Sequence, residues 1–166
     1  MIRHIVPQWE MAEYRALDYV LAYHKDTELN DLYAAAGHNR EAMSMCRYFE
    51  PSPMPGSMRY ILTHFQDLDN VAMAVNLFRP GQYLPMHSDL YDRYTELHNP
   101  RRLPVLRAII MLENCEPGQI LQIGYTAHAR WQAGDVFWWR DDDQHAFYNF
   151  SRSDRYAVQI TGVKSP

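Results

Sequence analysis

Two side chains that often bind metal ions, His87 and Asp89, stand two residues apart in the segment PMHSDLYDRY (85–94). The run before them is typical of a β-strand, and residues i and i+2 of a strand lie on the same face. We therefore expect the imidazole and the carboxylate to point into the same space. The pair alone is a weak indication of a metal site, because such a pair is more often a hydrogen-bonding pair at the surface.

A third candidate ligand, His145, stands in the segment RDDDQHAFYNF at the start of a later apolar run. Two ligands close in sequence and one far along the chain allow a β-barrel to bring opposite strands to one metal ion. Two histidines and one carboxylate form the facial triad of non-heme Fe(II) oxygenases, which leaves coordination positions open. The three residues together therefore predict a metal centre that can take further ligands.

A candidate anion-binding residue, Arg155, opens the run RYAVQITG, ten residues after His145. On a strand, Arg155, Ala157 and Gln159 share one face. An arginine on an inner face is unusual unless it has a partner, and a guanidinium pairs with a carboxylate through two hydrogen bonds. Arg155 is therefore predicted to anchor an acidic co-substrate. Two alternatives stay open: Arg155 closes a surface turn, or Arg107 on another core strand is the anchor.

The ordered set His87-Ser-Asp89, His145 and Arg155-Tyr-Ala-Val resembles the double-stranded β-helix 2-oxoglutarate/Fe(II) oxygenases, in particular their prolyl-hydroxylase-like branch. Three further stretches within about residues 70 to 162 are similar to motifs of that family: NLFRPGQYLPMHSD, PGQILQIG and AGDVFWW. The resemblance implies that His87, Asp89 and His145 bind Fe(II). It also implies that Arg155 binds the distal carboxylate of 2-oxoglutarate.

The resemblance further implies the reaction, which is hydroxylation of a C–H bond by O2 with succinate and CO2 as co-products. The carboxylate at Asp89 favours hydroxylation over halogenation, because related halogenases lack a ligand at that position. The oxidised substrate is expected to be a peptidyl residue or a small metabolite, and the sequence does not choose between them.

The strand that precedes the first ligand departs from the family pattern. Many relatives have a tyrosine where Phe78 stands, and its hydroxyl helps to bind 2-oxoglutarate. Phe78 cannot donate that bond, and Asn76 on the same strand face is the candidate replacement in the co-substrate pocket. The alternative is that Asn76 only satisfies neighbouring backbone groups.

A long segment, residues 90–104, separates the first ligand pair from the next predicted strand. It exceeds what a hairpin needs, and long ordered loops are often lids or binding loops. Its early polar and aromatic residues, Tyr91, Arg93 and Tyr94, are therefore candidates for substrate contacts. The alternative is a passive surface excursion.

Helical patterns come first in the chain and strand patterns follow. We expect helices over residues 8–24, 28–37 with Gly37 as its end, and 57–68 with Ser57 as its cap, and a loop over 50–57. Short apolar runs follow, separated by turn signals. Their residues are 71–78, 82–88, 105–112, 119–125, 135–139, 144–150 and 155–163.

This order predicts an α+β fold, namely a double-stranded β-helix (jelly-roll, cupin-like) core with N-terminal helices packed outside it. We expect one oxygenase domain over residues 1–166. Residues 1–69 are expected to be mainly helical support, and residues 70–163 to form the jelly-roll core.

Composition narrows the partners. A net charge of −4 argues against a nucleic-acid partner, and the chain has no apolar run long enough for a membrane span. Two cysteines without motif spacing and no apolar signal core predict a cytoplasmic protein. A non-oxygenase cupin-like protein that binds Zn or another divalent metal is the main alternative function, and an interaction module without metal is a third. The oligomeric state is left open.

Overall fold

The computed structural model describes residues 3–21, 27–38, 45–49, 54–98 and 104–165, and it describes the side chains of most of them. Four helices and ten strands are assigned in this part of the chain. In chain order they are α1 (Met11–Arg15), β1 (Val20–Leu21), α2 (Thr27–Ala35), β2 (Met45–Phe49), α3 (Gly56–Leu62), β3 (Leu68–Phe78), β4 (Tyr83–His87), α4 (Asp92–His98), β5 (Val105–Met111), β6 (Gln119–Ile123), β7 (Thr126–His128), β8 (Val136–Arg140), β9 (His145–Asn149) and β10 (Arg155–Lys164).

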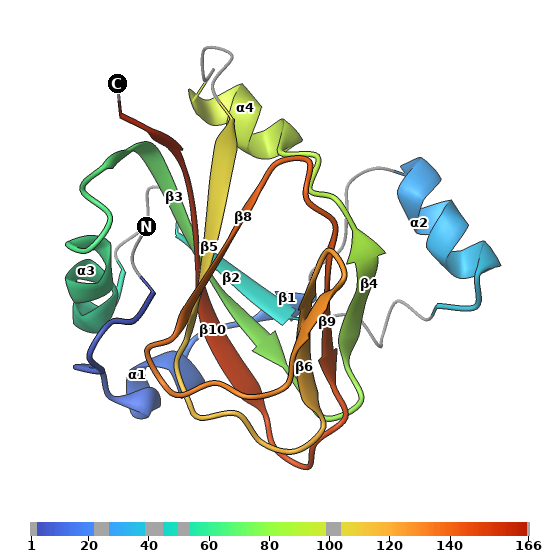
Figure 1. The fold of residues 1–166 in the computed structure, drawn as a ribbon, viewed down its shortest axis with the longest axis horizontal. Helices are drawn as coiled ribbons and strands as arrows, with labels where there is room; N and C mark the ends of the chain where they lie inside the picture. The colour runs from blue at the N-terminus through green and yellow to red at the C-terminus, as the bar shows by residue number, and fades with distance from the viewer. Residues whose placement is uncertain (1–2, 22–26, 39–44, 50–53, 99–103, 166) are drawn as a thin grey trace.

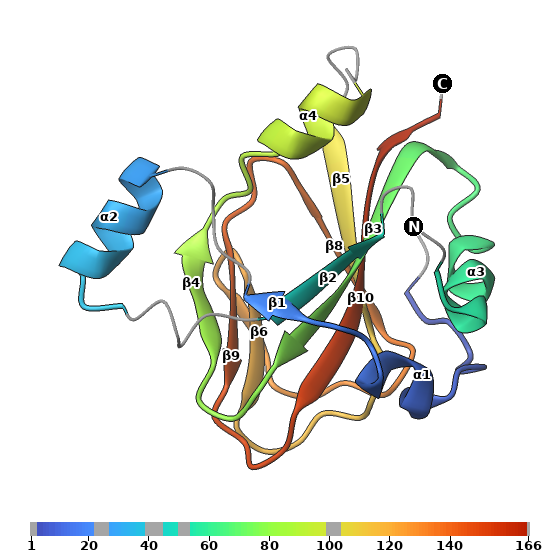
Figure 2. The ribbon, with the colours of Figure 1, turned by 180° about the vertical axis from the view of Figure 1, so that it is seen from behind.

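The strands form two antiparallel sheets that face each other (Figures 1 and 2). The larger sheet has the order β1-β2-β3-β10-β5-β8, and the smaller sheet has the order β4-β9-β6-β7. Neighbours in each sheet are mostly far apart in sequence, as in a jelly roll. The predicted jelly-roll fold is therefore confirmed. Among the described helices, none is long and apolar enough to cross a membrane.

The central strand β10 separates two apolar clusters because its side chains alternate between its faces. Tyr156, Val158 and Ile160 point outward and pack with residues of α1 and α3, including Tyr14 and Ile61. The opposite face of the strand points between the sheets, into a cluster in which half of the buried members are aromatic. The buried members of this inner cluster are Phe78, Ile109, Met111, Leu121, Trp131, Trp139, Phe147 and Ala157.

The N-terminal segment differs from its prediction. The expected helix over residues 8–24 is reduced to α1, and Val20 pairs with Cys46 in β2 instead. The hydroxyl of Tyr19 donates to the carbonyl of Tyr14, just beyond the end of α1. Strands β1 and β2 thus extend the larger sheet with residues that were expected to be helical support. Pairing with a distant strand has overridden a helical pattern here.

Two other helices were predicted correctly in position but not in every detail. Helix α2 ends near Gly37, whose φ of 84° is the left-handed conformation that glycine adopts most easily. Helix α3 begins at Gly56 after Pro55, and no side chain caps it. Ser57 instead donates to Glu13 at 2.5 Å and so links α3 to α1. The prediction that Ser57 caps this helix was therefore wrong. Residues 50–53 of the loop predicted over 50–57 lie outside the described part.

Candidate metal centre

The three predicted ligands meet at one end of the barrel. His87 is the last residue of β4 and His145 is the first residue of β9, and the two are directly paired in the ladder. Asp89 follows β4 by two residues. One ligand atom from each residue can be chosen so that all three lie within 4.8 Å of one another. The antiparallel pairing of β4 with β9 therefore brings His145 next to His87 and Asp89, from which it is far apart in sequence.

Hydrogen bonds fix which nitrogen each histidine presents. Nδ1 of His87 lies 2.7 Å from the carbonyl of Pro85, and Nδ1 of His145 lies 3.2 Å from the carbonyl of Asp143. A carbonyl only accepts, so each Nδ1 carries a proton, and in the neutral imidazole each Nε2 then has the lone pair that a metal would take. Both Nε2 atoms face Asp89, at 3.9 Å for His87 and 3.5 Å for His145.

These donors fit a divalent metal. Two neutral imidazole nitrogens and one carboxylate are a donor set that Fe(II) and other first-row metals accept. The Nδ1–carbonyl bonds are the orienting contacts that metal-bound histidines usually have. Both imidazoles are buried, so the site is sheltered from bulk water.

Asp89 is ionised in this site. Burial would raise the pKa of its carboxyl group, but Arg107, His145 and His87, together with a hydrogen bond from Trp139, outweigh burial and lower the pKa to about 2. Arg107 donates to Oδ1 at 2.8 Å, and the Trp139 indole donates to Oδ2 at 3.3 Å. The carboxylate therefore has a bonding partner at each oxygen.

Trp139 was not among the predicted site residues. It and its neighbour Trp138 point to opposite faces of β8. Trp138 packs outward against Phe65, with ring centroids 5.4 Å apart, whereas Trp139 stacks on His145 at 4.3 Å. Strand alternation indicated that one of the two faces the interior, but the sequence did not place that face at the ligands.

Arg155 lies at the other end of the barrel, because β9 runs away from the metal centre and β10 begins after the following turn. Arg155 is buried, with 3% of its surface exposed. The guanidinium carbon lies 4.6 to 5.1 Å from the ring centroids of Phe147, Trp131 and Phe78. Nη2 contacts the sulfur of Met111 at 3.5 Å, while Nε and Nη1 have no hydrogen-bond partner among the described residues.

The electrostatics of Arg155 are those of a desolvated cation. Burial lowers the pKa of its guanidinium to about 9, and Cys115 opposes that shift. Within the described part of the chain, no carboxylate forms a hydrogen bond or ion pair with it. The alternative that Arg155 closes a surface turn is wrong, because the residue is buried.

The other two predicted co-substrate residues lie beside Arg155. In the β3–β10 ladder, Phe78 is opposite Arg155, and Asn76 is opposite Ala157. Phe78 stacks on Phe147 at 5.3 Å. The Asn76 amide nitrogen donates to Oε1 of Gln159 at 3.2 Å, so this amide bonds a side chain rather than the neighbouring backbone.

The segment after Asp89 forms helix α4, and residues 99–103 of the predicted lid lie outside the described part. Tyr91 and Tyr94 are both buried and pack edge to face at 6.4 Å. The side chain of Arg93 is not among those described. The candidate substrate tyrosines thus lie beneath the surface near the metal centre.

One residue from the N-terminal third was not anticipated near the site. Tyr33 on α2 is buried, which raises the pKa of its phenol, and the charge of Asp89 raises it further. Helix α2 therefore lies near the same end of the barrel as the three candidate ligands. No motif in the sequence pointed to this placement.

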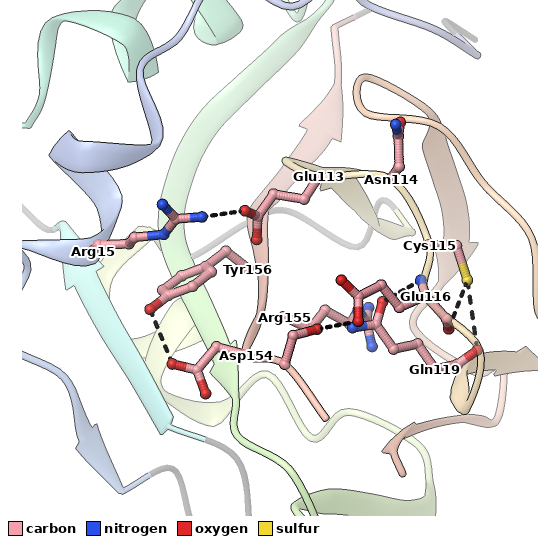
Figure 3. A pocket seen from close by; sticks show the side chains of 10 residues that line it. Arg15, Glu113, Asn114, Cys115, Glu116, Gln119, Asp154, Arg155 and Tyr156 are labelled. Atoms are coloured by element: carbon pink, nitrogen blue, oxygen red, sulfur yellow. Dashed lines mark hydrogen bonds and ion pairs between the residues drawn. The ribbon is translucent and has the colours of Figure 1, made fainter. Parts of the chain in front are cut away.

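A cavity opens at the Arg155 end of the barrel (Figure 3). It has a volume of about 490 Å³. Arg15 and Glu113 form an ion pair of 2.6 Å across its wall, and Glu116 accepts a bond from Ser153. Arg155 also lines this cavity, so the guanidinium lies between the barrel interior and a polar opening.

Comparisons with known proteins support the fold. No protein-family model matches the sequence, and a search of curated proteins finds no match. Among solved structures, the chain is similar to a prolyl-4-hydroxylase from Pseudomonas putida, with 14% identity, a TM-score of 0.56 and 83% of each chain covered.

Two further solved structures are similar at lower scores. The plu4264 protein from Photorhabdus luminescens has 12% identity and a TM-score of 0.46, with 72% of this chain and 74% of that chain covered. The Cnp3 cupin domain from Schizosaccharomyces pombe has 9% identity and a TM-score of 0.45, with 73% and 65% covered. At 14% identity the likeness to the prolyl-4-hydroxylase concerns the fold alone.

Proposed function

We propose that the protein is an Fe(II)- and 2-oxoglutarate-dependent oxygenase that hydroxylates a C–H bond of a peptidyl residue or small metabolite. The observation that carries the proposal is Arg155, whose buried guanidinium has no carboxylate partner in the part of the chain that the structure describes. It lies in a barrel whose other end holds a His–Asp–His cluster. A barrel that only binds metal has no need of such a residue.

His87, Asp89 and His145 would hold the metal. When bound, Fe(II) supplies open coordination positions for a 2-oxo acid and O2. The chain's own residues do the rest of the positioning. The carbonyls of Pro85 and Asp143 hold both Nε2 atoms toward Asp89, and the burial of the two histidines keeps water from competing.

Arg155 supplies the second anchor. Its pKa of about 9 keeps it protonated at neutral pH. Nε and Nη1 have no hydrogen-bond partner among the described residues, so the guanidinium keeps donors for a carboxylate. Arg155 is buried and contacts three aromatic rings, so a carboxylate placed there forms an ion pair in a poorly solvated space.

The two anchors share an aromatic neighbour. The Arg155 guanidinium lies 4.6 Å from the centre of the Phe147 ring. That ring centre lies 6.4 Å from the centre of the His145 ring. A molecule with a keto acid at one end and a carboxylate at the other would bridge the two anchors.

The test is anaerobic loading with Fe(II) and 2-oxoglutarate, followed by exposure to air. We expect a weak visible charge-transfer band before air and succinate after it. His145→Ala should abolish both signals. Arg155→Met should keep metal binding and raise the KM for 2-oxoglutarate about ten- to a hundredfold, the equivalent of about 1.5–3 kcal/mol.

The matched control is Arg152→Met, which removes an exposed arginine from the turn just before Arg155. It should leave the KM unchanged. Tight binding of Zn(II) with no band, no succinate and no effect of Arg155→Met would favour the non-oxygenase cupin alternative, because N and O donor sites bind Zn(II) more tightly than Fe(II).

A further inference from the structure

The carboxylate of Asp89 is held by two neighbouring strands of the opposite sheet. Arg107 on β5 and Trp139 on β8 are directly paired in the ladder, and both point into the barrel. Arg107 donates to Oδ1 at 2.8 Å and Trp139 to Oδ2 at 3.3 Å. Asp89 follows β4 of the smaller sheet, so these bonds cross from one sheet to the other at the candidate metal centre.

Arg107 itself packs against the aromatic ring of Tyr91. Its guanidinium carbon lies 4.7 Å from the centre of the Tyr91 ring. Tyr91 has a φ of 56°, a left-handed conformation that tyrosine seldom adopts. This turn comes two residues after Asp89. It places the Tyr91 ring against Arg107, which holds the Asp89 carboxylate.

Trp139 is fixed by the ligands themselves. Its ring is tilted by 34° against His145 with centroids 4.3 Å apart, and the ring of His145 lies 4.3 Å from that of His87. Trp139 is 3% exposed. The indole N–H therefore has little freedom to leave Asp89.

We propose that Arg107 and Trp139 are positioning residues that hold the Asp89 carboxylate in the orientation in which it would bind the metal. The inference rests on the metal-binding part of the proposed function. Arg107 bonds one oxygen through a strong charge-assisted hydrogen bond, and Trp139 bonds the other, so two donors from the opposite sheet fix the carboxylate. Without them the carboxylate could turn about its side-chain bonds away from the two histidines.

The arrangement also sets up two opposing effects on metal affinity. Arg107 is a cation next to a site for a dication, so Coulomb repulsion alone predicts tighter binding when Arg107 is removed. The orienting bond predicts weaker binding, because partners of metal ligands typically contribute ten- to a hundredfold in affinity. The proposal requires that orientation outweigh repulsion.

The experiment measures Mn(II) affinity and the water-proton relaxation rate of bound Mn(II) in the full chain without substrate. Arg107→Met should weaken Mn(II) binding about ten- to a hundredfold. The relaxation rate per bound ion should change as well, because a carboxylate that has turned alters how many waters the ion keeps. Arg140→Met, which alters an exposed arginine beside Trp139 in sequence, should change neither quantity.

Trp139→Phe keeps an aromatic ring beside His145 but removes the N–H together with part of the indole, and its effect on Mn(II) affinity should have the same direction and be several-fold smaller. It also tests the inference should Arg107→Met not fold. Tighter Mn(II) binding by Arg107→Met, or unchanged affinity and relaxation in both variants, would overturn the inference alone. Failure of the wild-type chain to bind Mn(II) at all would overturn the proposed function as well.

Discussion

Two arginines mark the two ends of the barrel, and their surroundings differ. Arg107 and Arg155 both lie on central strands of the larger sheet and point inward. Arg107 has a carboxylate partner at 2.8 Å, whereas Arg155 contacts aromatic faces and a methionine sulfur and has no bonded carboxylate among the described residues. A buried charge is costly unless it is paired. The chain itself therefore explains the first arginine, and the proposed ligand would explain the second.

This contrast also separates the two candidate anchors of the sequence analysis. Arg107 was the rival to Arg155 because it too lies on a core strand. In the structure its Nη1 is occupied by Asp89, and its charge is matched there. Arg155 has two free donors and no matching charge among the described residues. The predictions below act on one arginine or the other.

Removing the partner of Arg107 should have the largest effect on stability. Asp89→Ala leaves a guanidinium that is 14% exposed without a carboxylate. Breaking such a pair costs about 3–5 kcal/mol when it is fully buried, and we expect about 3 kcal/mol here. Urea unfolding of the metal-free protein measures the loss.

The double variant Asp89→Ala/Arg107→Met is the control for that loss. It removes both charges, so most of the lost free energy of unfolding should return, while metal binding stays absent. A double variant as unstable as Asp89→Ala would show that the loss comes from something other than the stranded arginine.

Low pH should weaken the ion pair between Asp89 and Arg107. The pKa of Asp89 is lowered in the folded state from 3.8 to about 2, so the carboxylate stabilises the fold above pH 3.8. That stabilisation is lost as pH falls through about 2 and amounts to roughly 2 kcal/mol, at 1.36 kcal/mol per pKa unit.

The measurement compares unfolding of metal-free wild type and Asp89→Asn between about pH 5 and pH 2. The wild type should be the more stable of the two at the upper pH, and the two should converge at the lower. A stability difference that does not change with pH would mean that the carboxylate has no depressed pKa.

The opposite result is expected for Arg155. Arg155→Met replaces an unpaired buried cation with an apolar chain, so the ligand-free protein should gain about 1–2 kcal/mol in free energy of unfolding. Thermal unfolding measures the gain. Added 2-oxoglutarate and Mn(II) should stabilise the wild type more than the variant.

Arg152→Met again serves as the control, since the removed arginine is exposed, and it should leave the melting temperature nearly unchanged. A ligand-free Arg155→Met protein that is less stable than wild type would mean that the aromatic faces already satisfy the cation. In that case Arg155 would be a structural residue and no ligand would be needed to explain it.

The sequence predicted features that depend on local periodicity. Alternation along β10 placed Arg155 and Ala157 on the inner face and Tyr156 on the outer face, as found. The spacing of His87 and Asp89 predicted a shared direction, and the strand pattern around His145 predicted a distant third member. Each of these statements needs only the geometry of a single strand.

Features that depend on pairing between distant strands were not predictable. Strand β1 falls in a predicted helix, and no strand was predicted over β2, because the pairing partners of both lie elsewhere in the chain. The bonds from Arg107 and Trp139 to Asp89 require the β5–β8 register and the approach of the other sheet. Nothing in the local sequence of Trp139 distinguishes it from a core tryptophan.

The smallest expected effect concerns Phe78, which stands where many oxygenases have a tyrosine. Its ring centre lies 5.1 Å from the Arg155 guanidinium carbon. Phe78→Tyr adds a hydroxyl beside the expected place of the distal carboxylate. One neutral hydrogen bond contributes about 0.5–1.5 kcal/mol, so the KM for 2-oxoglutarate should fall about two- to tenfold.

Packing opposes this gain, because Phe78 is 2% exposed and stacks on Phe147 at 5.3 Å. An added oxygen in a filled core costs stability, so the melting temperature should fall slightly even as the KM improves. Phe137→Tyr, which adds the same oxygen to a partly buried ring on β8, controls for general disturbance and should leave the KM unchanged. A KM that rises in Phe78→Tyr but not in Phe137→Tyr would place the carboxylate against the Phe78 ring itself. An unchanged KM in both would mean that the carboxylate binds away from Phe78. The proposed ligand would then no longer explain the buried charge of Arg155, which lies against the Phe78 ring.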